Sequence, residues 1–193
     1  MPGLPGKREA AVMIFLLALI AAGLSAWAIV AYNLFVRDRA RVAAAWSDVG
    51  VQLKRRHDLI PKLVETVKQH AGFERGVLER VVQARSQALG AGTPFEKRGP
   101  ESNIARDLQR LLLVAEAYPE LKASQSFLDL QHSLSDTEDQ IQYARRYYNG
   151  AVNNLNTRVD TFPDLLIGRL FGFQTAEYFE LDSADDAKPG EVA

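Results

Sequence analysis

The stretch AAVMIFLLALIAAGLSAWAIVAYNLFV, residues 10–36, decides how this chain of 193 residues is organised. It contains no charged residue, and Ser25 and Asn33 are its only clearly polar side chains. A helix needs about 20 apolar residues to cross the hydrocarbon core of a bilayer. Residues 10–32 therefore predict a transmembrane helix. Trp27 lies toward its end, where aromatic side chains favour the membrane interface.

A cleavable secretory signal is the alternative for the same stretch. Lys7 and Arg8 would form its basic start, and Ala26-Trp27-Ala28 has the small-x-small pattern that signal peptidases cut. The apolar run continues past that site to Val36, which favours an uncleaved anchor. Basic residues lie on both sides of the run, and long segments cross membranes largely regardless of charge. Both orientations of the following domain therefore stay open.

Small residues recur along the anchor. Ala18, Ala22 and Ala26 are spaced by four residues, which places them on one face of a helix. Such faces allow transmembrane helices to approach closely. The three alanines are therefore a candidate packing face for oligomerisation, although alanine is also an ordinary filler of membrane anchors.

Beyond the apolar run the pattern predicts helices only. Val42, Trp46, Val49 and Leu53 repeat at intervals of four, three and four residues, so the anchor helix is expected to continue. Pro61 lacks the backbone N–H, and we expect it to break or kink this helix and to start a new one that reaches residue 89.

The second half of the chain predicts one loop and two further helices. Residues 90–101 are rich in glycine and proline and indicate the loop, and residues 102–117 and 124–161 indicate the helices. Apolar residues in the last helix alternate at three and four positions, the spacing of helical bundles. The expected fold is all-α, with a transmembrane helix that continues into an antiparallel four-helix bundle. The expected domains are a tail (1–9), the transmembrane helix (10–32), the bundle (33–180) and a disordered acidic tail (181–193).

Composition and motifs exclude several kinds of chemistry. The net charge of −1 gives no overall attraction to nucleic acid, and the absence of cysteine excludes thiolate sites and cysteine nucleophiles. Asp129 and His132 have the i, i+3 spacing of metal ligands, but a di-iron bundle needs a second such motif and further carboxylates. His70 and Glu74 form no HExxH motif. We therefore expect no metal, no cofactor, no catalytic residue and no enzyme activity.

The densest cluster of charge comprises Lys54, Arg55 and Arg56, with Lys62 nearby. In a continuous helix Lys54 lies about 27 Å beyond Val36, which exceeds the roughly 10 Å over which salt leaves a membrane surface potential effective. These residues are therefore a candidate patch for acidic side chains, either within the bundle or on a protein partner. A solvated helix face is the alternative.

Several stretches together resemble the LemA family. The longest is VQLKRRHDLIPKLVETVK, residues 51–68, and the similarity extends over about residues 32–180. The other stretches are Tyr32-Asn33, AWSDV (45–49), AEAYPELKA (115–123), Thr137-Glu138, Ala144-Arg145-Arg146, Tyr147-Tyr148-Asn149, Phe162-Pro163 and Phe171-Gly172-Phe173. Leu155-Asn156 departs from the family, which more often has Tyr-Asn there.

The resemblance implies a bacterial protein with an N-terminal membrane anchor, a four-helix bundle and no established enzyme activity. Some relatives carry a lipid-modified cysteine, which indicates an extracytoplasmic domain, but this chain has no cysteine. Relatives associated with magnetosome membranes imply membrane-organising roles in some lineages.

The sequence thus predicts a single-pass protein of the bacterial inner membrane that acts as a helical scaffold or adaptor. Its expected partners are the lipid bilayer and an unknown protein bound by the bundle, and no nucleic acid is expected. The alternative is a homo-oligomeric sensor or pore-like assembly formed through the small-residue face of the anchor.

Overall fold

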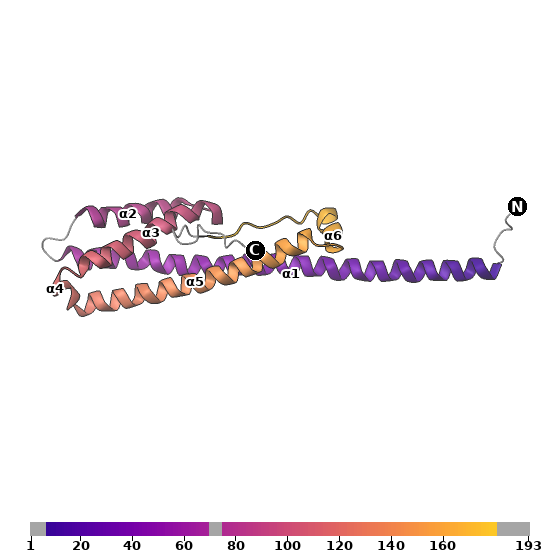
Figure 1. Ribbon diagram of the computed structural model, residues 1–193, viewed down its shortest axis with the longest axis horizontal. Helices are drawn as coiled ribbons and strands as arrows, with labels where there is room; N and C mark the ends of the chain where they lie inside the picture. Colours follow the sequence, from indigo (N-terminus) through magenta and orange to yellow (C-terminus); the bar gives the residue numbers. More distant parts are fainter. Residues whose placement is uncertain (1–6, 70–74, 181–193) are drawn as a thin grey trace, which may run out of the picture. The chain divides into compact units, whose positions relative to one another are not determined.

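The computed structural model describes residues 7–69 and 75–180, and every regular element in these ranges is an α-helix (Figure 1). The helices are α1 (Lys7–Lys68), α2 (Arg75–Gly90), α3 (Pro94–Ala115), α4 (Pro119–Lys122), α5 (Gln125–Asp160) and α6 (Asp164–Phe171). The predicted all-α class with a long apolar N-terminal helix is confirmed. The predicted acidic tail, most of the N-terminal tail, His70 and Glu74 lie outside the described residues.

Residues 11–26 of α1 form an exposed apolar surface. Within the described ranges α1 contains the one helix segment long and apolar enough to cross a membrane, with a mean hydropathy of 2.5. Side chains such as Phe15 (63% exposed) and Leu24 (59%) have no protein cover. The same helix continues through Val42 and Leu53 to Lys68, so the apolar run and the first polar helix are one element as predicted.

Pro61 lies inside α1, so the predicted break is wrong. Proline has no N–H, and the carbonyl of His57, four residues earlier, therefore has no donor within the helix. Nε of Arg85 in α2 donates to this carbonyl oxygen at 2.8 Å. Because a neighbouring helix supplies the missing donor, α1 continues past the proline. Residues 61–68 belong to α1, and α2 begins at Arg75.

This substitution of donors can be tested by a double-mutant cycle. Arg85→Ala leaves the His57 carbonyl without a donor, and we expect it to lower the free energy of unfolding by about 1–3 kcal/mol. In a Pro61→Ala background the restored N–H at residue 61 replaces the lost donor, so Arg85→Ala should have a clearly smaller effect. Urea unfolding followed by circular dichroism measures both. Equal losses of unfolding free energy in the wild-type and Pro61→Ala backgrounds would contradict the assignment of Arg85 as the replacement donor.

The predicted loop at residues 90–101 is also largely wrong, because α3 begins at Pro94. The Thr93 side chain accepts a hydrogen bond from the Glu96 backbone N–H at 3.2 Å, and the Glu96 carboxylate accepts from the Thr93 N–H at 3.0 Å. This reciprocal capping box satisfies N–H groups that a helix start leaves free. Bonds from the backbone N–H groups of Thr93 and Gly92 hold the pKa of Glu96 below its ordinary value. Pro94 occupies the first turn, where its missing N–H is harmless.

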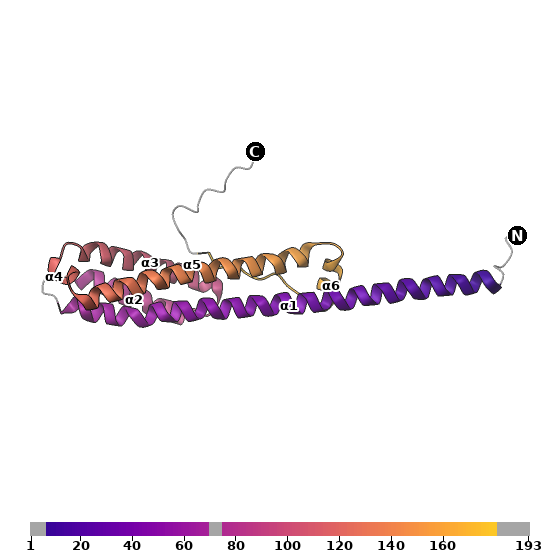
Figure 2. The ribbon, with the colours of Figure 1, turned by 90° about the horizontal axis from the view of Figure 1, so that it is seen from below.

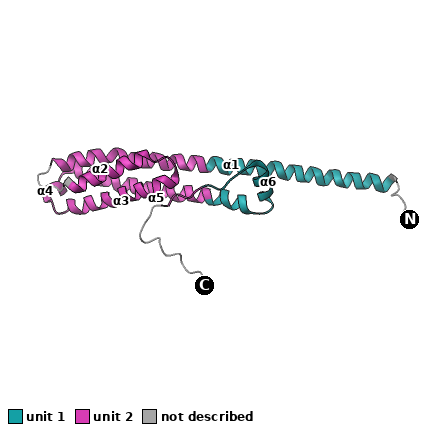
Figure 3. Cartoon of the chain, turned by 90° about the horizontal axis from the view of Figure 1, so that it is seen from above, with its two compact units in different colours: residues 1–41, 153–176 teal, residues 42–152, 177–193 magenta. Residues whose placement is uncertain are grey.

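The chain divides into two compact units, shown in Figure 3. Unit 1 comprises residues 1–41 and 153–176, and unit 2 comprises residues 42–152 and 177–193. Helices α1 and α5 each contribute to both units.

Unit 2 contains the main apolar core, to which α1 to α5 all contribute. Figures 1 and 2 show α2 and α3 side by side. The predicted apolar face of α5 is confirmed, since Phe127, Leu134, Ile141 and Tyr148 are all buried. The core cluster consists of Ile60, Leu63, Val64, Val67, Val77, Leu78, Val81, Ala84, Ala88, Ile104, Leu108, Leu111, Ala115, Leu121, Phe127 and Leu134.

Two asparagines of α5 hold the non-helical segment of residues 173–180. In unit 2, Asn149 donates to the Phe179 carbonyl at 3.1 Å and accepts from the Phe179 N–H at 2.9 Å. In unit 1, Asn156 forms the same pair of bonds with Ala176, at 3.0 and 2.8 Å. Each side-chain amide thereby satisfies both polar backbone groups of one residue, as a neighbouring strand would.

Phe179 is fully buried beside the aromatic side chain of Trp46. Its ring lies 5.4 Å from that of Trp46, which in turn lies 5.3 Å from the ring of Tyr148. Burial raises the pKa of Tyr148, whose hydroxyl donates to the carbonyl of Glu177 at 2.7 Å. The end of the described chain is therefore part of the folded core of unit 2.

Unit 1 is held by a charge cluster at the end of α5. Arg158 donates to Asp38 of α1 at 2.8 Å and to Asp164 of α6 at 2.6 Å. The Asp38 side chain is almost fully buried, and Arg158, together with Arg37 at 3.6 Å and Arg41 at 3.7 Å, supplies the positive charge that a buried carboxylate needs. Gly172, with a φ of 70°, ends α6 in the left-handed conformation that glycine adopts without strain.

Candidate functional site

Arg56, a member of the predicted basic patch, is fully buried in unit 2. Its guanidinium forms an ion pair with Glu101 of α3 and another with Glu138 of α5, the latter at 2.7 Å. Nε2 of His57 lies 3.2 Å from one carboxylate oxygen of Glu101 and 3.3 Å from the other. Arg56 therefore connects α1 to two other helices and does not belong to an exposed surface. The acidic side chains that Arg56 binds therefore lie within the fold, as one of the predicted alternatives for the basic patch stated.

The charge on Glu101 is stabilised inside the fold. Burial alone would raise its pKa, but the hydrogen bond from His57 and the positive charge of Arg56 outweigh burial and hold the pKa of Glu101 below its ordinary value of 4.5. The glutamate is therefore ionised at neutral pH, as an ion pair requires. Because Arg56 and Glu101 are both fully enclosed, this cluster acts within the fold.

The other three residues of the predicted patch remain exposed on α1. Lys54, Arg55 and Lys62 line a shallow surface groove, together with Val51, Asp58 and Leu59. Its whole lining belongs to one charged stretch of α1, which presents the ammonium and guanidinium groups and the Asp58 carboxylate beside apolar carbon. Such a surface suits carboxylates that are accompanied by an apolar side chain.

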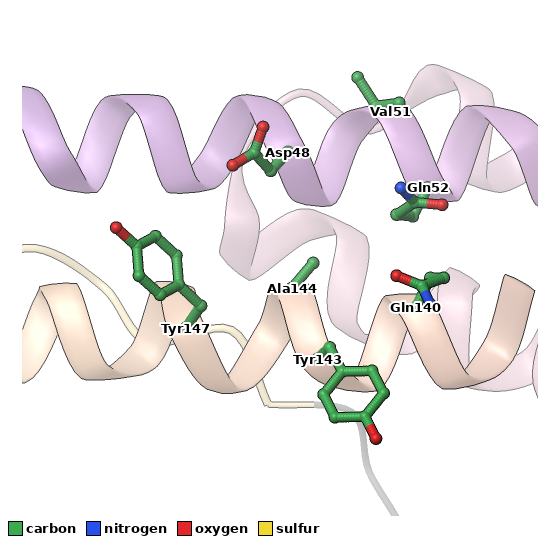
Figure 4. Close-up of a pocket in the computed structure, with 7 residues that line it drawn as sticks. All are labelled: Asp48, Val51, Gln52, Gln140, Tyr143, Ala144 and Tyr147. Atoms are coloured by element: carbon green, nitrogen blue, oxygen red, sulfur yellow. The ribbon is translucent and has the colours of Figure 1, made fainter.

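A second groove, here called the α1–α5 groove, adjoins the first through Val51 (Figure 4). It has a volume of about 290 Å³. Asp48, Val51 and Gln52 line it from α1, and Gln140, Tyr143, Ala144 and Tyr147 line it from α5. Figure 4 shows Tyr147 and Asp48 on facing sides of the opening, and Gln52 opposite Gln140. The short side chain of Ala144 leaves the space between them open.

The aromatic side chains of this groove are well exposed. Tyr143 is 60% exposed, Tyr147 is 61% exposed and Val51 is 59% exposed. The guanidinium of Arg146 lies over the Tyr143 ring, 4.7 Å from its centroid. Exposed tyrosines beside arginine are typical of protein-binding surfaces, because they combine apolar area with a polar end. Asp48 is the one carboxylate of the lining, which suits binding better than acid–base chemistry.

The remaining candidate residues are widely separated. Ala18, Ala22 and Ala26 are exposed on α1, so their role as a packing face stays a prediction. Asp129 accepts a hydrogen bond from Gln125 at 2.8 Å, and His132 lies 3.7 Å from Asp136 on an exposed part of α5. In residues 7–69 and 75–180, no group of three or more histidine, aspartate or glutamate side chains is arranged to hold a metal ion.

A scan against protein-family models matches residues 45–193 to the LemA family. The chain belongs to the LemA family. The matched range includes the Arg56 cluster, both grooves and α6, whereas residues 10–36 precede it.

Three of the similar proteins show how far this likeness extends. Magnetosome protein MamQ 2 of Paramagnetospirillum magneticum is 25% identical over 181 residues, which cover 80% of this chain and 66% of the relative. MamQ of Magnetospirillum gryphiswaldense is 24% identical with the same coverage. Protein LemA of Metamycoplasma hominis is 29% identical over 133 residues, which cover 67% of this chain and 60% of the relative. The LemA-family chain described here thus spans slightly less than two thirds of these relatives' length.

Proposed function

We propose that this LemA-family protein is a single-pass, membrane-anchored helical scaffold or adaptor of a bacterial inner membrane and has no enzyme activity. Its proposed architecture is an antiparallel four-helix bundle of α1, α2, α3 and α5. The exposed apolar half of α1 supports the anchor, and the apolar core shared by these helices supports the bundle. The names of the magnetosome relatives support a role in a bacterial assembly.

The observation that carries this proposal is the pair of adjoining grooves. Exposed Tyr143 and Tyr147 would bind an apolar side chain of a protein partner, and Lys54, Arg55 and Lys62 would bind its carboxylates. Aromatic anchors contribute most of the binding energy in protein interfaces, whereas charges at the rim mainly set orientation and association rate. The expected partner segment is therefore acidic, with at least one large apolar side chain.

Photo-cross-linking in native membranes tests the proposal. A benzophenone amino acid at Tyr143 should give one discrete cross-linked partner, and Lys54→Glu with Arg55→Glu should reduce that product by about tenfold or more, as the loss of two charge contacts implies. Arg106→Glu with Arg110→Glu makes the same change of charge on exposed positions of α3 and should leave the product unchanged. Equal yields from both charge-reversed variants, or no product at Tyr143, would overturn the assignment of the groove.

The alternative assembly is a homo-oligomer formed through Ala18, Ala22 and Ala26, which are uncovered on α1. Small residues allow close helix contact, and Ala22→Leu should disrupt it. Cross-linking that yields a discrete multiple of this chain, lost in Ala22→Leu and kept in the charge-reversed groove variant, would favour this second function.

A further inference from the structure

Four large apolar side chains in and beside α6 are exposed. Phe162 is 72% exposed, Leu166 is 52%, Leu170 is 74% and Phe171 is 56%. Leu166 and Leu170 are four residues apart on a short helix and therefore share one face. Four exposed large apolar side chains within ten residues of sequence need a cover, whereas single apolar residues scattered over a surface are ordinary.

The position of α6 along α1 indicates what covers these apolar side chains. The Phe171 ring lies 4.9 Å from the ring of Tyr32, and the Phe173 ring stacks on Phe35 with centroids 4.7 Å apart. Tyr32 and Phe35 belong to the last turn of the apolar run that ends at Val36. One such turn rises only about 6 Å. The end of α6 therefore lies level with the end of the candidate membrane span.

Close packing fixes which side of α6 is outward. Ile167 and Gly168 are buried, and a Cβ added at Gly168 would lie 3.3 Å from the ring of Phe35. Only glycine therefore allows α6 to approach α1 this closely without displacing that ring. Figure 3 shows α6 beside α1 within unit 1. With Ile167 and Gly168 against α1, Leu166 and Leu170 are directed outward.

Basic side chains accompany this apolar surface. Arg37, Arg39, Arg41 and Arg169 are all exposed, and the guanidinium of Arg39 lies 5.4 Å from the centroid of the Phe173 ring. Arginines at the end of an apolar span meet the phosphates of lipid headgroups, whose negative surface potential acts over about a Debye length. Apolar side chains next to such arginines are the pattern of helices that lie in the membrane interface.

We propose that α6, together with Phe162, is a second membrane contact that lies in the interface of the leaflet through which α1 leaves the bilayer. Leu166, Leu170 and Phe171 enter the outer part of the acyl region, and the four arginines meet the headgroups. This inference rests on the proposed function, because it requires α1 to span that bilayer. It adds a lipid-binding surface distinct from the protein-binding grooves of unit 2.

Site-directed labelling of the full chain tests this contact. The protein has no cysteine, so a single introduced cysteine can be labelled with the environment-sensitive fluorophore NBD without background. The labelled positions are Leu24→Cys in the anchor, Leu166→Cys and Leu170→Cys in α6, and Leu113→Cys on α3, which is 61% exposed and serves as the matched control. Each variant is reconstituted in vesicles of phosphatidylcholine and phosphatidylglycerol, with and without brominated acyl chains.

We expect NBD at residues 24, 166 and 170 to be blue-shifted and quenched by brominated lipid, and NBD at residue 113 to be unaffected. A quenched label at Leu24 with unquenched labels at Leu166 and Leu170 would overturn the lipid contact of α6 and leave the anchor intact. An unquenched label at Leu24 would overturn the proposed anchor instead. Quenching at Leu113 equal to that at Leu170 would also refute the inference, because exposed leucines in general would then meet lipid.

Discussion

Replacing Arg56 by methionine is expected to lower the free energy of unfolding by about 3–5 kcal/mol, because it leaves a buried carboxylate without its partner. Glu101 is fully enclosed and has Arg56 and His57 as its partners, whereas the Glu138 side chain is 33% exposed and can be hydrated. Urea or thermal unfolding in detergent measures the loss. Arg55→Met changes the exposed neighbour in the same way and should have almost no effect.

The dependence on pH separates this mechanism from lost packing. The pKa of Glu101 is depressed in the fold, so its ionisation adds stability above its unfolded-state pKa, and that stability is lost as the pH falls through the lower folded-state value. Without Arg56, burial should raise the pKa of Glu101. The difference in the free energy of unfolding between the wild type and Arg56→Met should therefore be largest at neutral pH and should decrease on acidification.

A compensated variant completes the test. Arg56→Met with Glu101→Leu removes both buried charges, and we expect it to recover most of the stability, since apolar replacements of a buried pair are often neutral. If Arg56→Met alone lowers the free energy of unfolding by less than about 1 kcal/mol, which is the range of exposed ion pairs, the structural role of Arg56 is contradicted.

Replacing Phe35 by alanine is the second large effect that we expect. Phe35 is fully buried in unit 1, where it stacks on Phe173 and touches Gly168. Removal of a buried phenylalanine side chain typically destabilises by about 3–5 kcal/mol. Since roughly 1.4 kcal/mol corresponds to a factor of ten, hydrogen exchange in residues 164–176 should accelerate by about a hundredfold or more.

Phe15→Ala is the matched control for this variant. Phe15 lies in the same apolar run but is 63% exposed, so its removal should leave exchange in residues 164–176 unchanged. Exchange rates in α6 that do not respond to Phe35→Ala would show that α6 is held to α1 by other contacts, such as those of Arg158.

The parts of the fold that a repeated sequence pattern specifies were predictable from sequence. The apolar run of residues 10–36 and the alternating spacing in α5 each depend on many residues, so no single side chain can overrule them. The buried positions of Phe127, Leu134, Ile141 and Tyr148 follow directly from that spacing.

Each wrong prediction came from a residue whose local preference is met by another group. In one case that group is distant in sequence, and in the other it is a neighbour. Pro61 removes a donor that Arg85 of α2 replaces, and no local pattern shows that contact. The glycines and prolines between residues 90 and 101 suggested a loop, although Thr93 and Glu96 have the spacing of a capping box. This spacing is typical of a helix start and agrees with the beginning of α3 at Pro94.

The charged site was only half predictable. Adjacent basic residues in one helix point in different directions, so Arg55 is exposed while Arg56 is buried. Glu101 could not be recognised as its partner, because it lay in the segment that was predicted to be a loop. Glu138 follows Thr137 on the buried face of α5, which was the one available signal. Of the tyrosines in the α1–α5 groove, Tyr147 belongs to a stretch that resembles the LemA family, whereas Tyr143 showed no signal beyond its helical spacing.

The division of both α1 and α5 between the units affects how the protein can be cut for crystallisation. Removing residues 1–41 to discard the apolar run would also remove Phe35 and Asp38, which pack against Phe173 and pair with Arg158. The remaining chain would then contain residues 153–176 without residues 1–41, the other part of unit 1. Residues 153–176 would become prone to aggregation. A fragment that begins just before Ala31 keeps these contacts and omits most of the apolar run. Fragments for crystallisation should therefore start inside the apolar run, before Ala31, and not after its end at Val36.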